Sequence, residues 1–403
     1  MLSSEINGFS SQERLIRAAL AIWANQGHSA MSARLISRDT ALPTSSIYHH
    51  FGSMEQLLQS AQAHARDAAQ AWCEARIAEI STWPSGGGPE SLARMLAVFL
   101  DDWVQENREL AFAWNQCHLL AQRDAAYLPA IDAWRQTWAR FWNEACYRAG
   151  LAEHAGATSH IFEATGQMHL IRWNRTIDRA ALDEFCTGWG KWLSGSLAEE
   201  GPWRRHAREI ALASSPELSA PNGVAAMIAD AAADVVEDLG IAALTHRAVA
   251  AGAGVTLGVV SYNYRTSADL VRAAFDAIYR RLTAPILDKP AHPADRGEML
   301  AAWADFSSQP RRLAAMEELI LAVARDPGLR DFGPQLRYLR GRSSSLQLAL
   351  QLGPEARISP LDAAIYSSMV SGQRRALIGL PEADIHAGLD AADALVARLR
   401  KTD

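Results

Sequence analysis

The sequence predicts an all-α protein built from two similar halves. Apolar residues recur with helical spacing along most of the chain, and one segment of this pattern returns 213 positions later. Each copy of that segment is followed by a similar length of further helical sequence. The 403 residues also exceed the usual size of a single hydrophobic core, which favours at least two domains. We therefore expect two all-α units in tandem.

The first element of each copy is an amphipathic helix that ends at a glycine. Its apolar residues follow the i, i+3, i+4, i+7, i+8 spacing of a helix that faces a core. In the first copy these residues are Leu15, Ala18, Ala19, Ile22 and Trp23, followed by Gly27. In the second copy they are Ile228, Ala231, Ala232, Val235 and Val236, followed by Gly240. Glycine is common just past a helix end, so both segments predict the same first helix.

Two short helices and a turn follow in each copy. Ser32 and Thr245 supply hydroxyl groups that can accept a backbone N–H at the start of a helix. The matching positions continue through the turn, as Leu42 with Val255, Ile47 with Val260, and Phe51 with Tyr264. A second short helix after about four residues is typical of a helix-turn-helix.

A long helix then begins at a capping box in both copies. The boxes are Ser53-Met-Glu-Gln56 and Thr266-Ser-Ala-Asp269, in which the hydroxyl and the third side chain satisfy free amides reciprocally. Because the two boxes stand at equal distances from two matching turns, coincidence is a poor explanation for the repeat.

Together these motifs resemble the N-terminal DNA-binding domain of the TetR family. That pattern runs helix, glycine, second helix, turn, recognition helix, a Tyr-x-His-Phe signature and a capped helix. The first copy follows it closely through Tyr48-His49-His50-Phe51, and the second follows it more loosely through Ser261-Tyr262-Asn263-Tyr264. The resemblance covers about 47 residues in each half. It implies a ligand-responsive DNA-binding repressor, with two subunits fused into an intramolecular pseudo-dimer.

Matching positions imply the DNA-contacting residues. In the first unit they are Ser32, Arg34, Thr44, Ser45, Ser46, Tyr48, His49, His50 and Ser53. In the second unit they are Thr245, Arg247, Gly258, Ser261, Tyr262, Asn263 and Thr266. Arginine pairs with guanine or phosphate, and hydroxyls and amides suit phosphates or base edges. Family members usually carry a phosphate-binding lysine where this chain has Met54 and Ser267, and often a glycine where it has Ala41.

The overall charge gives little support to DNA binding. The chain has a net charge of −6 and a pI near 6.1, whereas a basic domain is the usual footprint of a nucleic-acid binder. A local surface of hydrogen-bond donors is sufficient for DNA contact. If the rest of the chain is acidic, the net charge does not reveal that surface.

The repeat also sets the expected domain boundaries. Residues 1–58 and 222–271 are the two helix-turn-helix domains, and residues 59–198 and 272–403 are helical regulatory and dimerisation domains. Residues 199–221, rich in Pro, Ser and charge, are expected to form a linker. Fully extended, they would span at most ~75 Å, which is enough to join two adjacent subunits. One chain is then expected to bind one double-stranded operator as a monomer.

Tryptophan is concentrated in the first half. Twelve of the thirteen tryptophans precede residue 204, and Trp134, Trp138 and Trp142 recur every four residues. Core packing is the commoner explanation of such a stripe. The alternative is a cavity for a small apolar or aromatic effector. Its candidate residues are Trp103, Trp114, Asn115, His118, Trp138, His169 and Trp173.

Several other classes are disfavoured by the sequence. No apolar run is long enough for a bilayer, and the N-terminus lacks the pattern of a signal peptide, so a cytoplasmic protein is expected. Four separated cysteines predict reduced core thiols rather than disulfides or a metal site. No hydrolase or phosphate-loop motif indicates an enzyme, and no cofactor is expected. The alternative function is a small-molecule-binding or helical interaction protein that has lost DNA binding in one or both units.

Overall fold

The computed structural model describes residues 9–83, 85–214, 223–287, 310–353, 355–380 and 394–399, without the side chains of 282–287 and 310. Throughout these ranges the regular elements are α-helices and 3₁₀ turns, with no strand. The prediction of an all-α protein is confirmed.

The chain divides into two compact units whose limits differ from the predicted domain boundaries. Unit 1 comprises Met1–Leu170 with Arg375–Pro381, and unit 2 comprises Ile171–Arg374 with Glu382–Asp403. The division after residue 170 lies upstream of the expected linker. A short segment from late in the chain also belongs to unit 1.

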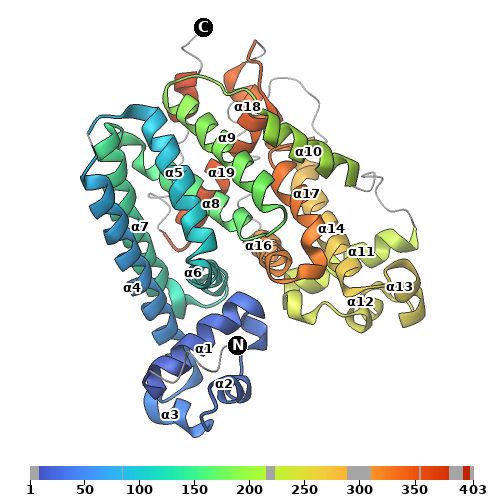
Figure 1. Ribbon diagram of the computed structural model, residues 1–403. Helices are drawn as coiled ribbons and strands as arrows, with labels where there is room; N and C mark the ends of the chain where they lie inside the picture. Colours follow the sequence, from blue (N-terminus) through green and yellow to red (C-terminus); the bar gives the residue numbers. More distant parts are fainter. Residues whose placement is uncertain are drawn as a thin grey trace. The chain divides into compact units, whose positions relative to one another are not determined.

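Unit 1 begins with three helices and the start of a fourth that form one small core (Figure 1). The elements are α1 (Ser11–Asn25), η2 (His28–Ala30), α2 (Ala33–Thr40), α3 (Ser45–Phe51) and α4 (Met54–Ser81). Leu15, Trp23, Ile36 and Ile47 are completely buried. The predicted apolar spacing of the first helix is thus a core-facing stripe.

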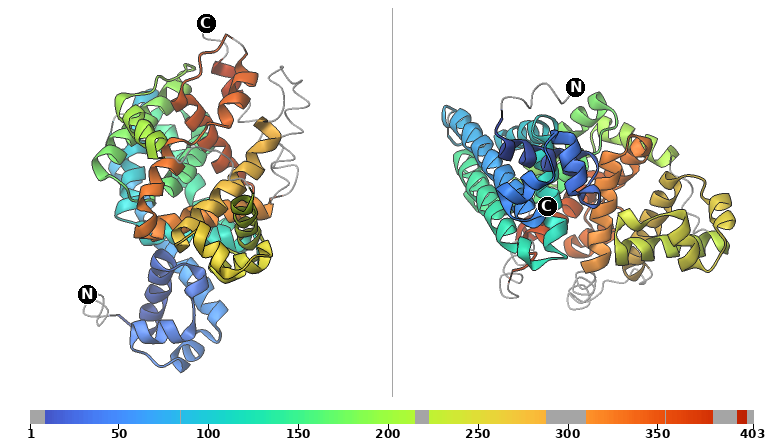
Figure 2. Two further views of the ribbon diagram at one scale, coloured as in Figure 1. Left: turned by 90° about the vertical axis from the view of Figure 1, so that its right-hand side faces the viewer. Right: turned by 90° about the horizontal axis from the view of Figure 1, so that it is seen from below.

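A helical bundle completes unit 1. Its elements are α5 (Gly88–Gln105), α6 (Arg108–Ala121), η3 (Ala125–Tyr127), α7 (Leu128–Ala149), η4 (Ala152–His154) and α8 (Ala155–His169). The long helices α4 and α7 run side by side (Figures 1 and 2). Helix α1 packs on α4 and α6, so the small N-terminal core is joined to the bundle through two helices.

The tryptophan stripe forms the core of this bundle. Trp134, Trp138 and Trp142 are at most 1% exposed. The Trp138 ring lies 5.0 Å from the rings of both Trp103 and Phe162, measured between centroids. Edge-on and tilted contacts at such distances are favourable between aromatic rings. The stripe therefore packs the interior, as the commoner interpretation expects.

Unit 2 is a second helical assembly. Its elements are α9 (Arg175–Leu193), α10 (Pro202–Ser214), α11 (Val224–Leu239), η5 (Ile241–Ala243), α12 (His246–Ala253), α13 (Leu257–Asn263), α14 (Ser267–Leu287), α16 (Pro310–Arg325), η6 (Pro327–Phe332), α17 (Gly333–Tyr338), α18 (Ser344–Leu352) and α19 (Pro360–Ala376). The last two residues of α19 fall in unit 1. Residues 394–399 are also helical.

The interpretation of residues 199–221 as a linker needs correction. Residues 202–214 form helix α10, which packs on α9 and α17. Ala207 and Ala211 lie one turn apart and are completely buried, and Arg204 is 4% exposed. The charges and proline suggested a linker, but an i, i+4 pair of alanines gives the segment a small apolar face.

Two turns of residues 11–53 recur in residues 224–266, whereas the positive φ of 78° at Gly52 has no counterpart at Arg265. Gly27 has φ 84° and ψ 173°, and Gly240 has φ 84° and ψ 168°. The turn after the second helix is left-handed in both copies, with φ 54° and ψ 30° at Ala41 and φ 65° and ψ 29° at Gly254. The repeat seen in the sequence is therefore also a repeat of local geometry.

A second correspondence lies further along each half. Asp124 follows α6 and accepts the Ala126 N–H at 2.9 Å, which starts a 3₁₀ turn. Asp326 follows α16 and accepts the Gly328 N–H at 2.8 Å, with the same result. The likeness between the two halves thus extends beyond their helix-turn-helix segments.

Candidate nucleic-acid interface

The second helix of the N-terminal segment begins as predicted. Ser32 has an extended backbone, and its hydroxyl oxygen accepts the Leu35 N–H at 3.2 Å. That hydroxyl keeps its own proton for donation to an external acceptor such as a phosphate. Arg34 stands in the first turn of α2 with an exposed side chain. The start of α2 thus presents a hydroxyl and a guanidinium group to solvent.

The turn between α2 and α3 is fixed by hydrogen bonds from two sides. The Arg14 guanidinium group donates to the carbonyl of Thr40, and the Ser37 hydroxyl donates to the carbonyl of Leu42 at 2.5 Å. Ala41 has the only positive φ at a non-glycine residue in the described ranges. A left-handed alanine is strained, so these contacts hold the turn in a conformation that alanine resists.

Helix α3 carries its polar residues on its outer side. Ile47 and Phe51 are buried beneath it, and Tyr48 is 54% exposed. The other outward residues are Thr44, Ser45, His49 and His50, with Ser46 half-buried. The His49 and His50 rings contact each other, with centroids 5.0 Å apart. The short helix is therefore anchored by two apolar residues and free to present hydroxyl, phenol and imidazole groups.

The predicted capping boxes are present to different extents. The hydroxyl of Thr266 accepts the Asp269 N–H at 3.1 Å, and Asp269 accepts the Thr266 N–H at 2.9 Å. The hydroxyl of Ser53 accepts the Gln56 N–H at 3.1 Å, but the reciprocal contact is absent from the described hydrogen bonds. Gln56 instead folds its amide towards Gly52. The box at Thr266 is complete, and that at Ser53 is a simple cap.

The second copy is held together in a similar way. Thr245 caps α12 by accepting the Ala248 N–H at 3.1 Å, and Arg247 is exposed in the following turn. The Tyr264 hydroxyl donates to the carbonyl of Ala225 at 3.0 Å and so ties the end of α13 to α11. The other predicted residues are all exposed, namely Gly258, Ser261, Tyr262, Asn263 and Thr266. The side-chain amide of Asn263 donates one hydrogen bond to the Val259 carbonyl at 2.9 Å.

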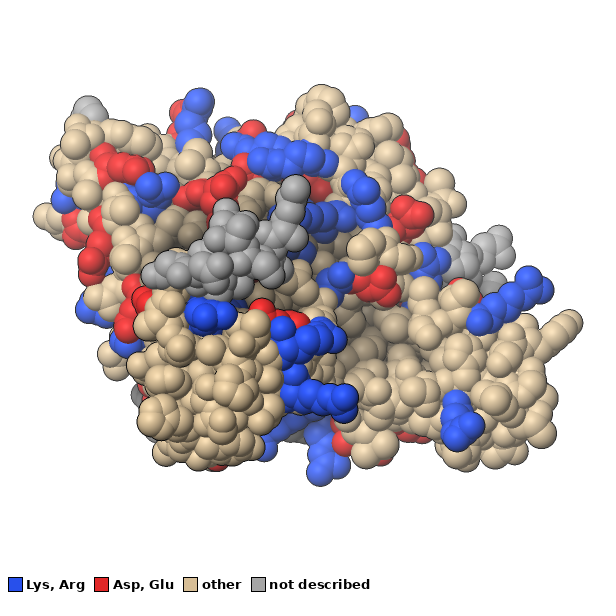
Figure 3. All heavy atoms as spheres, turned by 60° about the horizontal axis from the view of Figure 1, so that its bottom comes forward, with Lys and Arg blue, Asp and Glu red and all other residues tan. Residues whose placement is uncertain are grey.

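The two copies differ in charge. Residues 11–53 contain four arginines and two acidic residues, whereas residues 224–266 contain two arginines and four acidic residues. On the visible surfaces of α1–α3 and α11–α13, uncharged residues predominate, and basic side chains gather along one side of α1–α3 (Figure 3). Part of the acidic charge on α11 is neutralised, because Arg281 contacts Asp234 at 2.7 Å and Glu237 at 3.0 Å.

The N-terminal geometry defines a class of protein. A capped helix, a left-handed turn and a short helix with a polar outer face form a helix-turn-helix, the arrangement by which many regulators enter the major groove of DNA. Residues 15–61 match the model of a family described as "Bacterial regulatory proteins, tetR family". Residues 15–61 are thus similar to the regulatory proteins of this family. The match does not include the second segment, and no curated protein matches the chain.

The residues predicted to bind an effector are divided between the two units. Six of them belong to unit 1, and Trp103, Trp114 and Trp138 are at most 2% exposed there. Asn115, His118 and His169 are also buried. Trp173 belongs to unit 2, where its ring lies 6.0 Å from that of Tyr338. Trp173 follows the end of α8 at His169, and its part in an effector site stays a prediction.

Two charged residues beside these side chains escaped the sequence analysis. The Arg375 guanidinium group donates to the Asn115 side-chain oxygen at 3.0 Å, although the two lie 260 positions apart. Glu163 lies 3.8 Å from His118, and both are buried. Glu163 lies on α8 and His118 on α6, so no spacing along one helix predicts their contact. Arg375 reaches Asn115 of α6 only because of the tertiary fold. No local sequence signal marks either contact.

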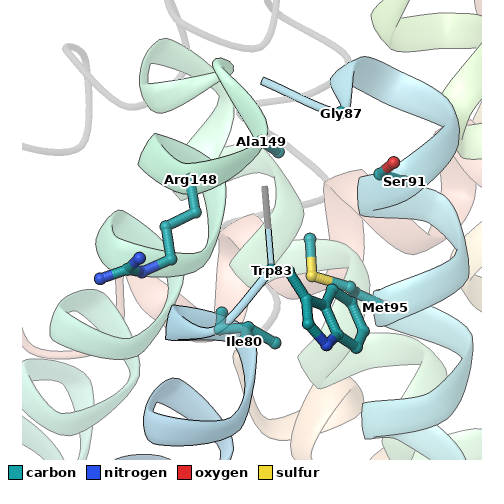
Figure 4. A pocket seen from close by; sticks show the side chains of 7 residues that line it. All are labelled: Ile80, Trp83, Gly87, Ser91, Met95, Arg148 and Ala149. Carbon is teal, nitrogen blue, oxygen red and sulfur yellow. The ribbon is translucent and has the colours of Figure 1, made fainter. Parts of the chain in front are cut away.

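A surface pocket of about 260 Å³ lies elsewhere in unit 1, and none of the predicted effector residues lines it. Figure 4 shows the Trp83 ring beside Met95, with Ile80 close by and the Arg148 guanidinium group directed away from them. Its lining is mainly apolar. The candidate effector residues are therefore not the walls of this pocket.

The remaining sequence predictions concern thiols, metals and membranes. Cys73, Cys117, Cys146 and Cys186 are buried and free of disulfides, and burial raises the pKa of both Cys117 and Cys146 to about 12. Across the described ranges, no cluster of His, Cys, Asp and Glu is suited to a metal ion. None of the helices searched there is long and apolar enough to cross a membrane.

Proposed function

We propose that this chain is a cytoplasmic transcription regulator, acting as a repressor, that binds one double-stranded DNA operator through two unequal helix-turn-helix units. The observation that carries the proposal is the recurrence of two turn conformations in the two segments. The glycine turn and the left-handed turn recur at Gly27 and Gly240 and at Ala41 and Gly254. Ser32 and Thr245, Arg34 and Arg247 then occupy equivalent positions.

A pseudo-dimer within one chain is supported by packing between late helices of the two halves. In unit 2, Gly188 of α9 lies against Leu361 and Ile365 of α19. The indole N–H of Trp192 donates to the completely buried Asp362 at 2.8 Å. In the family that the sequence resembles, the final helix pairs form a bundle between subunits. A single chain would then place two recognition helices in successive major grooves, ~34 Å apart.

The test is DNA binding by the full-length protein and single variants. The probe is DNA adjoining the protein's own gene, in a gel-shift assay with Arg34→Ala and Arg247→Ala. Arg94→Ala is the matched control, because this exposed arginine lies on α5 and pairs with Glu90. We expect both variants to weaken binding, Arg34→Ala more strongly, and the control to have no effect. Unchanged binding by both variants would refute the proposed interface.

The stoichiometry of the complex tests the pseudo-dimer separately. Sedimentation of the protein with its operator should give one chain per duplex, since the tether supplies the second unit at high effective concentration. A complex that requires two chains would contradict the intramolecular arrangement while leaving DNA binding intact.

We further propose that a small apolar or aromatic effector controls DNA binding from the tryptophan-rich core of unit 1. Among the described residues, the buried indole N–H groups of Trp114 and Trp138 have no hydrogen-bond acceptor. A ligand with an acceptor atom would satisfy such a donor. Titration of aromatic effectors should change tryptophan emission and release the operator, and Trp138→Phe should weaken both responses. An emission change without operator release would contradict regulation by the effector.

The alternative is a small-molecule-binding or helical interaction protein in which one or both units have lost DNA binding. The net charge of −6 and the acidic excess in residues 224–266 favour it for the second unit. A silent Arg247→Ala variant beside a defective Arg34→Ala variant would assign DNA binding to the first unit alone.

A further inference from the structure

Helix α13 exposes a leucine and a tyrosine at positions where α3 has a threonine and a histidine. Leu257 is 48% exposed and Tyr262 is 82% exposed. Gly258 between them borders open space, since an added Cβ would meet only the Thr256 hydroxyl oxygen, at 3.9 Å. The seven residues of α13 include no charged side chain.

The position of these residues points to DNA as the occupant. At the offset that aligns Gly27 with Gly240, Leu257 stands at the position of Thr44 and Tyr262 at that of His49. Val260 is completely buried and corresponds to Ile47, so α13 turns the same side inward as α3. Leu257 and Tyr262 are therefore exposed on the candidate second recognition helix, and Arg247 and Thr266 of the same segment are exposed as well.

The chemistry of the major groove limits what such a surface can read. The groove presents hydrogen-bond donors and acceptors, and its one apolar group is the C5 methyl of thymine. A leucine placed against the polar edge of guanine or cytosine would remove that edge from water and return no hydrogen bond. Against a thymine methyl, both partners bury apolar surface. The absent side chain at Gly258 lets the duplex approach closely beside Leu257.

We infer that Leu257 and Tyr262 recognise thymine methyl groups, which makes the part of the operator under α13 thymine-dependent. The inference rests on the proposed function. It assigns α13 a mode of recognition different from that of α3, whose Thr44, Ser45 and His49 offer hydrogen bonds. The operator is accordingly expected to be asymmetric, because contacts with thymine methyl groups are added to the polar contacts of Ser261 and Asn263 in one half only.

The experiment compares thymine with deoxyuridine, which lacks only the C5 methyl group. The probe is a duplex selected from a random library by the full-length protein. Hydroxyl-radical footprints of the wild type and of Arg247→Ala identify the half under α13. Deoxyuridine then replaces thymine in one half at a time, and Kd is measured at constant salt. We expect replacement under α13 to raise Kd about fourfold for each methyl group in contact.

The Leu257→Ala variant makes the test specific. It should bind the thymine operator more weakly than the wild type and lose most of its sensitivity to deoxyuridine under α13. Sensitivity in the other half should stay as in the wild type, which is the internal control. Leu257→Met should keep the sensitivity, and Leu257→Ala should keep the wild-type melting temperature because the side chain is half exposed.

The possible outcomes separate this inference from the proposed function. Failure to select any duplex would refute the proposed function itself. Selection of an operator that tolerates deoxyuridine or lacks thymine under α13 would overturn the inference alone. Unchanged operator affinity in Leu257→Ala, with a lower sedimenting mass of the free protein, would also overturn it and assign the surface to a second copy of the chain.

Discussion

Residues 11–53 and 224–266 share two turn conformations and a buried helical framework but have different outer surfaces. The shared features are the helix caps at Ser32 and Thr245, the turns at glycine or alanine, and buried residues such as Ile47 and Val260. The exposed features that differ are the balance of charge and the outer residues of α3 and α13, while buried positions differ mainly in size, as at Trp23 and Val236. The comparison teaches that a small set of buried and capping residues specifies the fold, while the exposed positions are free to change the ligand surface.

The largest expected effect comes from the shared core. Ile47→Ala should destabilise unit 1 by about 2–5 kcal/mol, because it removes buried methyl groups and leaves a cavity. Val260→Ala should cost less, since valine loses fewer carbon atoms. Urea unfolding followed by circular dichroism would measure both. Equal stability of wild type and Ile47→Ala would show that α3 is not held by this core.

A titrating residue distinguishes the second half from the first. Burial raises the pKa of Asp276 on α14 to about 6, despite nearby Arg272 and Arg280, while the matching residue of α4 is Ala63. An unfolded aspartate titrates near ~3.9, so the native state binds the proton more tightly and loses stability as the pH rises from about 4 to about 6. Asp276→Asn should therefore be more stable than the wild type by about 1–2 kcal/mol at pH 7.

The check on this prediction is a pair of thermal melts at pH 4 and pH 7. The gain in stability from Asp276→Asn should be small at pH 4, because residue 276 is then largely uncharged in the folded wild type as well as in the variant. A gain of the same size at both pH values would indicate a steric cause instead.

The left-handed turns offer a reciprocal exchange. Gly254→Ala should destabilise its turn by about 1 kcal/mol, because alanine resists a positive φ. Ala41→Gly relieves the same strain in the first copy, but glycine also gains freedom in the unfolded chain, so its net effect should be smaller than 1 kcal/mol. Chemical denaturation of the two single variants measures the difference. A larger change in the free energy of unfolding for Ala41→Gly than for Gly254→Ala would mean that the two turns are not equivalent.

The smallest expected effect concerns a missing phosphate contact. Met54 and Ser267 follow the caps at Ser53 and Thr266, where the resembled family usually has lysine. Met54→Lys should tighten operator binding and steepen the plot of log K against log salt concentration by about 0.9. Ser267→Lys should do the same if the second unit contacts DNA. A change in affinity without a change in slope would exclude a new phosphate contact.

Much of the fold followed from short-range sequence signals. The caps at Ser32 and Thr245 and the repeated apolar spacing depend on neighbouring residues, so the sequence alone indicated the helices and the turns. The contacts of Arg375 with Asn115 and of Trp192 with Asp362 join distant segments, and no local pattern marks them. The helix at 202–214 was missed because its buried residues are two alanines and an arginine, which carry a weak apolar signal.

The candidate DNA-binding residues were indicated by resemblance more than by chemistry. Arg34 and the hydroxyls of α3 are ordinary surface residues until a turn places them beside one another. Leu257 was overlooked because an apolar residue is normally assigned to a core, and only its exposure in the structure gives it another role.

The contact of Gly188 with Leu361 and Ile365 has a consequence for how such a protein evolves. In a dimer of identical subunits, every substitution appears in both subunits. A residue that leaves a cavity and the residue that fills it must therefore be encoded in the same sequence. In the proposed fused chain, a glycine on α9 can face a leucine on α19 without either change being copied elsewhere. Gene fusion would thereby release the two halves from symmetry, and each could then acquire its own half of an operator.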